Sequence, residues 1–148
     1  MSRAPFQVLV IPYRYSTDGS LEYCLLKRTD MGIWQFVAGG GETGETYHET
    51  AKRELVEETG SYGEGELIKL DTIFSVPVSA ISDRIHWLPD IYVIPCYCFG
   101  INLYNAVVQI STEHSAFCWL PYAQAAEQLH FDNNRTALWE LNERLQRE

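Results

Sequence analysis

Three glutamates in the first half of the chain are spaced as they would be on one side of a helix. Glu54, Glu57 and Glu58 stand at positions i, i+3 and i+4, and at about 100° per residue their side chains point in similar directions. Carboxylates this close repel one another and raise one another's pKa values unless a cation lies between them. Mg²⁺ and Mn²⁺ are hard cations that prefer oxygen ligands, so these side chains could share one or two such ions.

The same spacing also fits an ordinary solvated helix face. Glutamate-rich faces usually point to water and pair with a basic residue one turn away, and here Arg53 could pair with Glu57. Taken alone, the segment RELVEE favours this structural interpretation. The residues on either side of the segment decide between the two interpretations.

Those flanking residues form a long fixed pattern, GGGETGETYHETAKRELVEETGS, from Gly39 to Ser61. It resembles the signature of the Nudix hydrolases, G-x5-E-x7-R-E-U-x-E-E-x-G-U, where U is a bulky aliphatic residue. One position departs from it, because Ser61 stands where an aliphatic residue is usual. The residues in register are Gly39, Glu45, Arg53, Glu54, Leu55, Glu57, Glu58 and Gly60.

The resemblance implies Mg²⁺-dependent hydrolysis of a phosphoanhydride bond, with Mn²⁺ as a substitute. It implies that Glu54, Glu57 and Glu58 hold the metal together with the carbonyl group of Gly39. It further implies that Arg53 orients the glutamates and that Glu45 steadies the glycine-rich loop, with Gly60 as a structural residue of the motif. Glu57, Glu58 and Glu113 all remain candidates for the general base.

Other fragments resemble the bacterial subgroup that cleaves dihydroneopterin triphosphate and dATP: Leu26-Lys27-Arg28, Thr112-Glu113-His114 before Trp119-Leu120, and Asn133-Asn134-Arg135. This likeness implies that Glu113 is an additional metal ligand. It implies a substrate site formed by Arg3, Lys27, Arg28, Ala38 and Asn133, where Ala38 replaces a proline of many family members. Basic residues at strand ends are common, so Arg3, Lys27 and Arg28 could equally be surface residues. Hydrolysis of another nucleoside diphosphate derivative and nucleotide sensing without cleavage are the alternative functions.

The elements that must position these residues alternate between strands and helices. Strands are expected at 7–15, 22–27, 34–37, 67–76, 90–99 and 116–120, with a flexible joint at 61–66. Helices are expected at 46–59, from Pro121, and from an N-cap at Asp132 to the C-terminus, with Thr43 or Thr46 capping the first. Ala51 and Leu55 should pack on the sheet. This order predicts a single α/β domain over residues 1–148, and the resemblance implies an α/β/α sandwich with a mixed sheet.

The connection from Pro77 to Pro89 contains Arg84, His86 and Trp87. A segment of this length beside a site is either a substrate-binding lid or the end of a long hairpin. The sequence leaves both interpretations open.

Composition excludes several classes of protein. The net charge of −9 disfavours polymeric nucleic acid as a partner, because proteins that track a phosphate backbone carry a basic face. No apolar run is long enough to span a membrane, and the N-terminus reads as a strand and not a signal peptide, so a cytoplasmic protein is expected. The four cysteines lack zinc-site spacing and are expected to be buried thiols. The expected partner is a small phosphorylated molecule; a homodimer is compatible with the sequence but not required by it.

Overall fold

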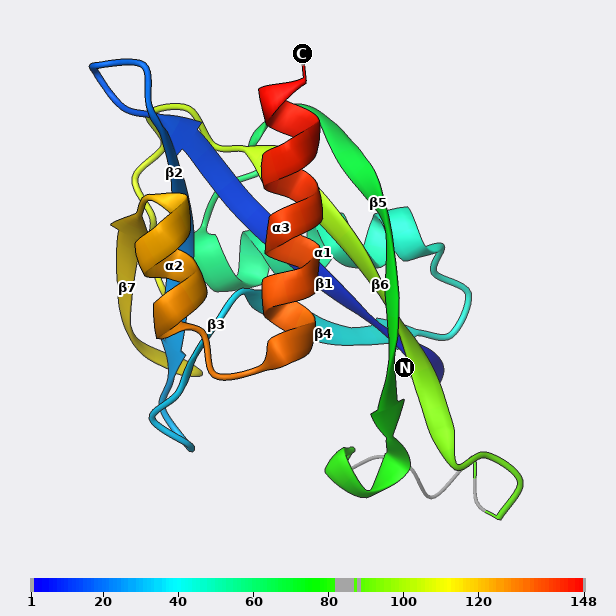
Figure 1. Ribbon diagram of the computed structural model, residues 1–148. Coiled ribbons are helices and arrows are strands. Elements are labelled where there is room, and N and C mark those ends of the chain that lie inside the picture. The colour runs from blue at the N-terminus through cyan, green and yellow to red at the C-terminus, as the bar shows by residue number, and fades with distance from the viewer. Residues whose placement is uncertain (1, 82–86, 88, 148) are drawn as a thin grey trace.

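The computed structural model describes residues 2–81, 87 and 89–147. The described elements follow one another as alternating groups of strands and helices (Figure 1). They are β1 Arg3–Tyr15, β2 Leu21–Arg28, β3 Trp34–Gln35, β4 Val37–Glu42, α1 Tyr47–Thr59, β5 Glu64–Pro77, the 3-10 helix η1 Val78–Ala80, β6 Val93–Asn102, β7 His114–Leu120, α2 Tyr122–Gln128 and α3 Asp132–Gln146.

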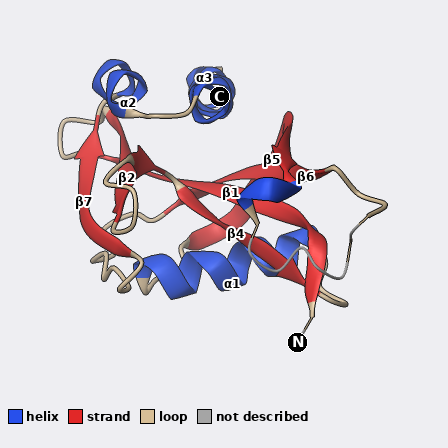
Figure 2. Cartoon of the chain, turned by 90° about the horizontal axis from the view of Figure 1, so that it is seen from below, coloured by secondary structure: helices blue, strands red, loops and turns tan. Residues whose placement is uncertain are grey.

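One mixed sheet lies between two helical layers. Its main order is β3-β2-β1-β6-β5, with β4 paired to β1 and β7 paired to β2. The β1–β6 pair is parallel and the other described pairs are antiparallel. Helices α2 and α3 cover one face and α1 covers the other (Figure 2). The predicted α/β/α sandwich is therefore confirmed.

Strand β1 supplies both halves of the hydrophobic core, because successive side chains of a strand point to opposite faces. Leu9 and Ile11 belong to the cluster under α2 and α3, together with the Leu138–Leu141 stripe of α3. Val8 and Val10 belong to the cluster under α1. Ala51 and Leu55 of α1 are fully buried in that second cluster, as predicted.

The ends of α1 are determined by local sequence. Thr46 is the N-cap and forms a capping box with Glu49: the Thr46 side chain accepts from Glu49 N, and the Glu49 side chain accepts from Thr46 N. Thr43 is not the cap; its hydroxyl donates to Ser2 O. Gly60 ends the helix in the left-handed conformation, with φ 73°. Both predicted helix ends are confirmed, with Thr46 chosen over Thr43.

The expectation of a glycine-rich loop at Gly39 was wrong. Residues Val37–Glu42 form β4, which pairs with β1 through Val8↔Gly39 and Gln7↔Gly40. A side chain at Gly39 would overlap the Glu54 carboxyl group, and one at Gly40 would overlap the Arg3 guanidinium. The glycines therefore let a strand run directly beneath the Glu54 and Arg3 side chains, and the loop begins only after Glu42.

Two further expectations need correction. Asp132 is the first residue of α3 and not its N-cap; Phe131 holds the cap position, and the Asp132 carboxylate pairs with Arg135 instead. Strand β5 already begins at Glu64, inside the predicted joint.

In the 77–89 connection, η1 follows β5 and Trp87 is buried, while Arg84 and His86 lie outside the described residues. The four cysteines are free thiols; Cys118 is only partly buried.

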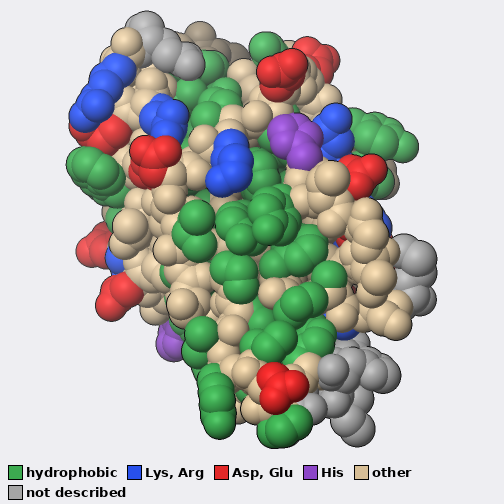
Figure 3. Space-filling view, turned by 90° about the vertical axis from the view of Figure 1, so that its right-hand side faces the viewer, with side chains coloured by type: hydrophobic (Ala, Val, Ile, Leu, Met, Phe, Trp, Pro, Cys, Tyr) green, Lys and Arg blue, Asp and Glu red, His purple; other side chains and the backbone are tan. Residues whose placement is uncertain are grey.

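Strand β5 forms one edge of the sheet, and apolar side chains gather on this side of the molecule (Figure 3). Ile73 and Val93 are more than half exposed there. At the irregularity between Lys69 and Ile73, the Glu140 carboxylate of α3 accepts from the backbone N–H groups of Asp71 and Thr72. An acidic side chain thus occupies edge hydrogen-bonding groups that another strand could otherwise use.

Candidate active site

Strands β2 and β4 pair with successive stretches of β1, on the side of β1 that faces away from β6. β1 pairs with β2 through Tyr13–Tyr15 and with β4 through Arg3–Val10. A cavity of about 890 Å³ is lined by residues from both strands, from α1, β5 and β6, and from the start of α3. The predicted residues that line it are Arg3, Arg28, Ala38, Gly39, Glu54, Glu57, Glu58, Glu113 and Asn133.

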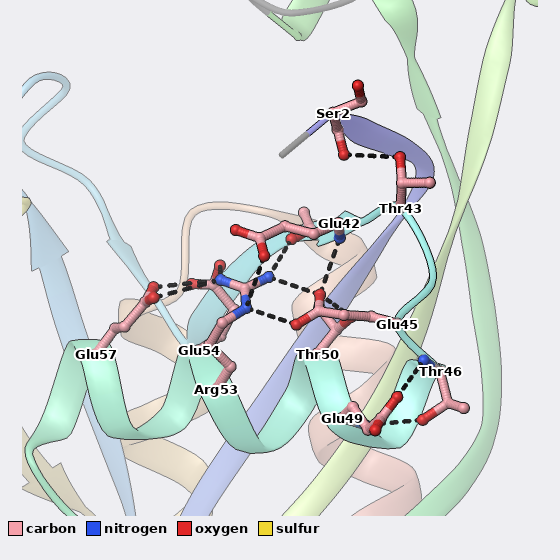
Figure 4. A network of polar contacts seen from close by, with 11 residues as sticks. Ser2, Glu42, Thr43, Glu45, Thr46, Glu49, Thr50, Arg53, Glu54 and Glu57 are labelled. Carbon is pink, nitrogen blue, oxygen red and sulfur yellow. Dashed lines mark hydrogen bonds and ion pairs between the residues drawn. The ribbon is translucent and has the colours of Figure 1, made fainter.

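Arg53 lies beside this cavity and joins three parts of the predicted motif (Figure 4). Its Nε and Nη2 donate to the two oxygens of Glu45 at 2.8 and 3.0 Å, and Nη2 also donates to Gly40 O at 2.8 Å. Its Nη1 donates to Glu54 Oε1 at 2.9 Å and approaches both oxygens of Glu57 at 3.4 Å. The guanidinium therefore connects β4, the loop before α1 and two of the clustered glutamates.

Glu45 holds the loop that leads into α1. Its Oε1 accepts from Glu42 N and Thr50 Oγ1, both at 2.8 Å, in addition to Arg53. Hydrogen bonding to Arg53, with further bonds from Glu42 and Thr50, lowers the pKa of the Glu45 carboxyl to about 2. Glu45 is consequently an ionised anchor between the end of β4 and the first turns of the helix.

The three clustered glutamates have different environments. Glu54 and Glu58 are buried, whereas the Glu57 side chain is 55% exposed. Burial, reinforced by the neighbouring Glu54 and Glu113 carboxylates, raises the pKa of Glu58 to about 10. Burial also raises the pKa of Glu54, against the opposing effect of Arg53. Without a cation, burial therefore favours the protonated form of Glu58.

Both oxygens of Glu58 are buried without a hydrogen-bond partner among the described residues. An unsatisfied buried acid is costly, and a divalent cation would both satisfy its oxygens and favour its ionised form. Among the described residues, however, no three carboxylate, imidazole or thiol groups already converge on one point. The residue types and the unsatisfied oxygens nevertheless fit a divalent metal.

Not all predicted residues reach the cavity. Lys27 is absent from the described lining; it lies on β2 where the β2–β7 register is irregular, between Lys27 and Arg28. Its neighbour Arg28 does line the cavity and is paired with Asp30 at 2.6 Å. Arg53, Glu45 and Gly60 also lie outside the described lining, which suits residues that position others.

Three buried polar residues in the cavity wall were not predicted from the sequence: Gln35, His114 and Asn134. His114, the first residue of β7, places Nε2 at 3.6 Å from Glu58 Oε1. Asn134 donates from Nδ2 to Asn133 Oδ1 at 2.7 Å, while its own Oδ1 accepts from Phe36 N at 3.4 Å. For His114 and Asn134 the available signal was adjacency to a predicted residue, Glu113 and Asn133 respectively; Gln35 had no such signal. Their burial could not be inferred from adjacency.

The layered fold, the glutamate-bearing helix and the cavity beside it define a class of hydrolase with a carboxylate-rich site. The chain belongs to the NUDIX domain family, whose model matches residues 6–139. It is a Nudix hydrolase. In Escherichia coli K12, dihydroneopterin triphosphate diphosphatase is 30% identical over 138 residues, which cover 92% of this chain and 91% of that protein.

Solved structures agree with this assignment. A Listeria monocytogenes protein assigned to the NUDIX hydrolases is 43% identical, with a TM-score of 0.86 over 97% of this chain and 96% of that one. The structure of the Escherichia coli dihydroneopterin triphosphate pyrophosphohydrolase is 26% identical, with a TM-score of 0.76 over 96% of this chain and 99% of that one. None of the described helices has the length and apolar character needed to cross a membrane.

Proposed function

We propose that this enzyme hydrolyses a phosphoanhydride bond of dihydroneopterin triphosphate or a nucleoside triphosphate, releasing pyrophosphate and a monophosphate. The observation that carries the proposal is the composition of the cavity. Its wall combines five carboxylates (Asp30, Glu54, Glu57, Glu58 and Glu113), two arginines (Arg3 and Arg28), and apolar side chains such as Leu9, Phe74 and Phe131. A triphosphate attached to a planar ring needs all three surfaces. The names of the relatives that match most of the chain support the same substrate class.

Glu54, Glu57, Glu58 and Glu113, with the Gly39 carbonyl, would hold Mg²⁺, or Mn²⁺ in its place. When bound, the metal supplies charge neutralisation for the phosphates and a more acidic water. Gly39 is suited to this position because the missing side chain lets the β4 backbone lie against Glu54. Glu57, Glu58 and Glu113 are the proposed choices for the residue that accepts the proton of the attacking water.

The remaining roles follow from charge and placement. Arg3 and Arg28 would bind the phosphate oxygens, because guanidinium groups match the geometry of phosphates. Asn133, held by Asn134, would present its amide to the ring. Ala38 in the lining leaves room beside the substrate. Arg53 and Glu45 would act by holding α1 against β4 and not by contact with the substrate.

The test is a substrate panel with Mg²⁺: dihydroneopterin triphosphate, dATP, 8-oxo-dGTP, ADP-ribose and a diadenosine polyphosphate, each followed by release of pyrophosphate and by product analysis. We expect either of the first two to have the highest kcat/KM. Glu58→Gln should lower kcat by at least about 10²-fold, because it removes a carboxylate from the metal site. Glu143→Gln is the matched control, since Glu143 lies on α3 and pairs only with Arg147 among the described residues.

Two results would contradict the proposal. If Glu58→Gln hydrolyses at the wild-type rate, the assignment of the glutamates fails. If no phosphoanhydride in the panel is cleaved while a nucleotide still binds, the nucleotide-sensing alternative replaces hydrolysis.

A further inference from the structure

His114 and Glu58 form a buried pair whose polar atoms are otherwise unsatisfied. The two side chains are each 2% exposed, and His114 Nε2 lies 3.6 Å from Glu58 Oε1. Among the described residues, neither ring nitrogen of His114 and neither oxygen of Glu58 has a hydrogen-bond partner. A polar side chain buried without a partner costs free energy, so a pair of them facing each other calls for a functional explanation.

The backbone holds His114 firmly in this place. As the first residue of β7 it pairs with Arg28 of β2, directly after an irregularity in the β2–β7 register. Its backbone N–H donates to Ser111 O at 3.2 Å, which closes the turn that carries Glu113. Glu58 is fixed on the facing helix α1, whose Ala51 and Leu55 are locked in the core. The two side chains therefore meet because two rigid elements present them.

The separation is slightly too long for a hydrogen bond. N–H···O bonds span about 2.7–3.2 Å, so a movement of about half an ångström would form one. A neutral imidazole has one donor nitrogen and one acceptor nitrogen. An ionised Glu58 has only acceptor oxygens, and a charged acceptor makes a shorter and stronger bond than a neutral one.

We propose that His114 is the positioning residue of the metal site: its Nε2–H donates to Glu58 Oε1 and thereby orients the carboxylate so that the other oxygen faces the metal. This inference rests on the proposed function, in which Glu58 holds a divalent cation. Ligating carboxylates are commonly held by a second hydrogen bond, and loss of such a partner lowers metal affinity or activity by about 10–100-fold. His114 would not contact the substrate.

Packing is the competing explanation, because a buried histidine could simply fill space between β7 and α1. The two explanations differ in what they predict for metal binding. If His114 only fills space, replacing it with an apolar ring should leave the Mn²⁺ affinity unchanged, whatever it does to stability. If His114 orients Glu58, the apolar ring should preserve the fold but lower the affinity of the site for Mn²⁺.

The experiment compares wild type, His114→Phe, His114→Gln and the control His48→Phe. His48 lies on the same helix as Glu58 but packs edge-on against Phe99, outside the described cavity lining. Melting temperature is measured in EDTA and then in increasing Mn²⁺, and Mn²⁺ binding is measured directly by calorimetry. Pyrophosphate release from dihydroneopterin triphosphate is measured in parallel.

We expect His114→Phe to melt in EDTA at or above the wild-type temperature, because it removes an unsatisfied buried imidazole. Its Mn²⁺ affinity should nevertheless fall about 10–100-fold. His114→Gln, whose amide can donate from a position close to that of Nε2, should stay within a few-fold of wild type, and His48→Phe should bind Mn²⁺ normally.

Two outcomes overturn the inference alone: His114→Phe binds Mn²⁺ as tightly as wild type, or His114→Gln loses as much affinity as His114→Phe. A fall in the EDTA melting temperature of His114→Phe, with unchanged affinity, would identify a packing residue. If wild type itself neither binds Mn²⁺ nor hydrolyses the panel, the proposed function fails and the inference falls with it.

Discussion

Arg53 binds both oxygens of Glu45 side-on, with Nε–Oε2 at 2.8 Å and Nη2–Oε1 at 3.0 Å. This two-point contact fixes the orientation of the guanidinium plane. Its third nitrogen, Nη1, is thereby directed at Glu54, 2.9 Å away. The position of a buried glutamate in the cavity wall thus depends on a loop residue that does not itself line the cavity.

Arg53→Lys should be far more damaging than its conserved charge suggests. A lysine cannot span Glu45, Gly40 O and Glu54 together, so we expect a loss of about 1–3 kcal/mol in the free energy of unfolding. Misplacing the glutamates should lower kcat by about 10²-fold. Urea unfolding and steady-state kinetics measure the two effects. Arg147→Lys, which changes the exposed Arg147–Glu143 pair, is the control and should be nearly silent; equal effects at both positions would refute the role of Arg53.

Glu45 should stabilise the protein in a pH-dependent way. Its folded pKa is lowered to about 2 from a reference of 4.5, so the folded state favours the ionised form. The stabilisation is fully present above the reference value and is lost as pH falls from about 4.5 toward 2. We therefore expect the difference in unfolding free energy between wild type and Glu45→Gln to shrink between pH 6 and pH 3, as measured by urea titration. A difference that stays constant over this range would contradict the ionised anchor.

Glu58 should show the opposite dependence in EDTA. Its folded pKa is raised to about 10 from 4.5, so the folded state favours the protonated form. The metal-free protein is then most stable with respect to this group below pH 4.5 and loses stability as pH rises toward 10. Replacing the acid with a neutral amide, Glu58→Gln, should raise the melting temperature more at pH 8 than at pH 5. An equal effect at both pH values would show that Glu58 is ionised without metal.

The sequence was sufficient for the helix and insufficient for its surroundings. Thr46, Glu49 and Gly60 are local signals that determine where α1 begins and ends, so their prediction needed no tertiary information. The glycines after Ala38 were misread because glycine favours turns in isolation; only the positions of Glu54 and Arg3, brought close by the fold, explain a strand there. His114 was missed for the same reason, since its neighbour in space, Glu58, is distant in sequence.

Gly39→Ala tests the close approach of β4 to α1. The added methyl group would overlap the Glu54 carboxyl group, so we expect a loss of about 1–3 kcal/mol in the free energy of unfolding from overpacking. Shortening the partner with Glu54→Asp should recover part of that loss in the double mutant, with a coupling of about 0.5–3 kcal/mol. Chemical unfolding of the four proteins closes the cycle. Strict additivity would show that the glycine is required for another reason.

Arg28 and Lys27 are adjacent basic residues of β2 that differ in whether they line the cavity, so they separate charge from position. Only Arg28 is among the described residues that line the cavity. Arg28→Gln should therefore raise KM for a triphosphate substrate about 10-fold, equivalent to about 1.4 kcal/mol of binding free energy, whereas Lys27→Gln should leave KM within about twofold.

Asp30→Asn extends the test: it removes the carboxylate that Arg28 contacts at 2.6 Å and should lower KM by freeing the guanidinium for phosphate. Steady-state kinetics at two ionic strengths measure all three variants, because a local contact in the cavity is screened by salt less than the long-range field of the protein. If Lys27→Gln and Arg28→Gln raise KM equally, the substrate senses the overall charge of this end of β2, and the assignment of Arg28 to the phosphate subsite is wrong.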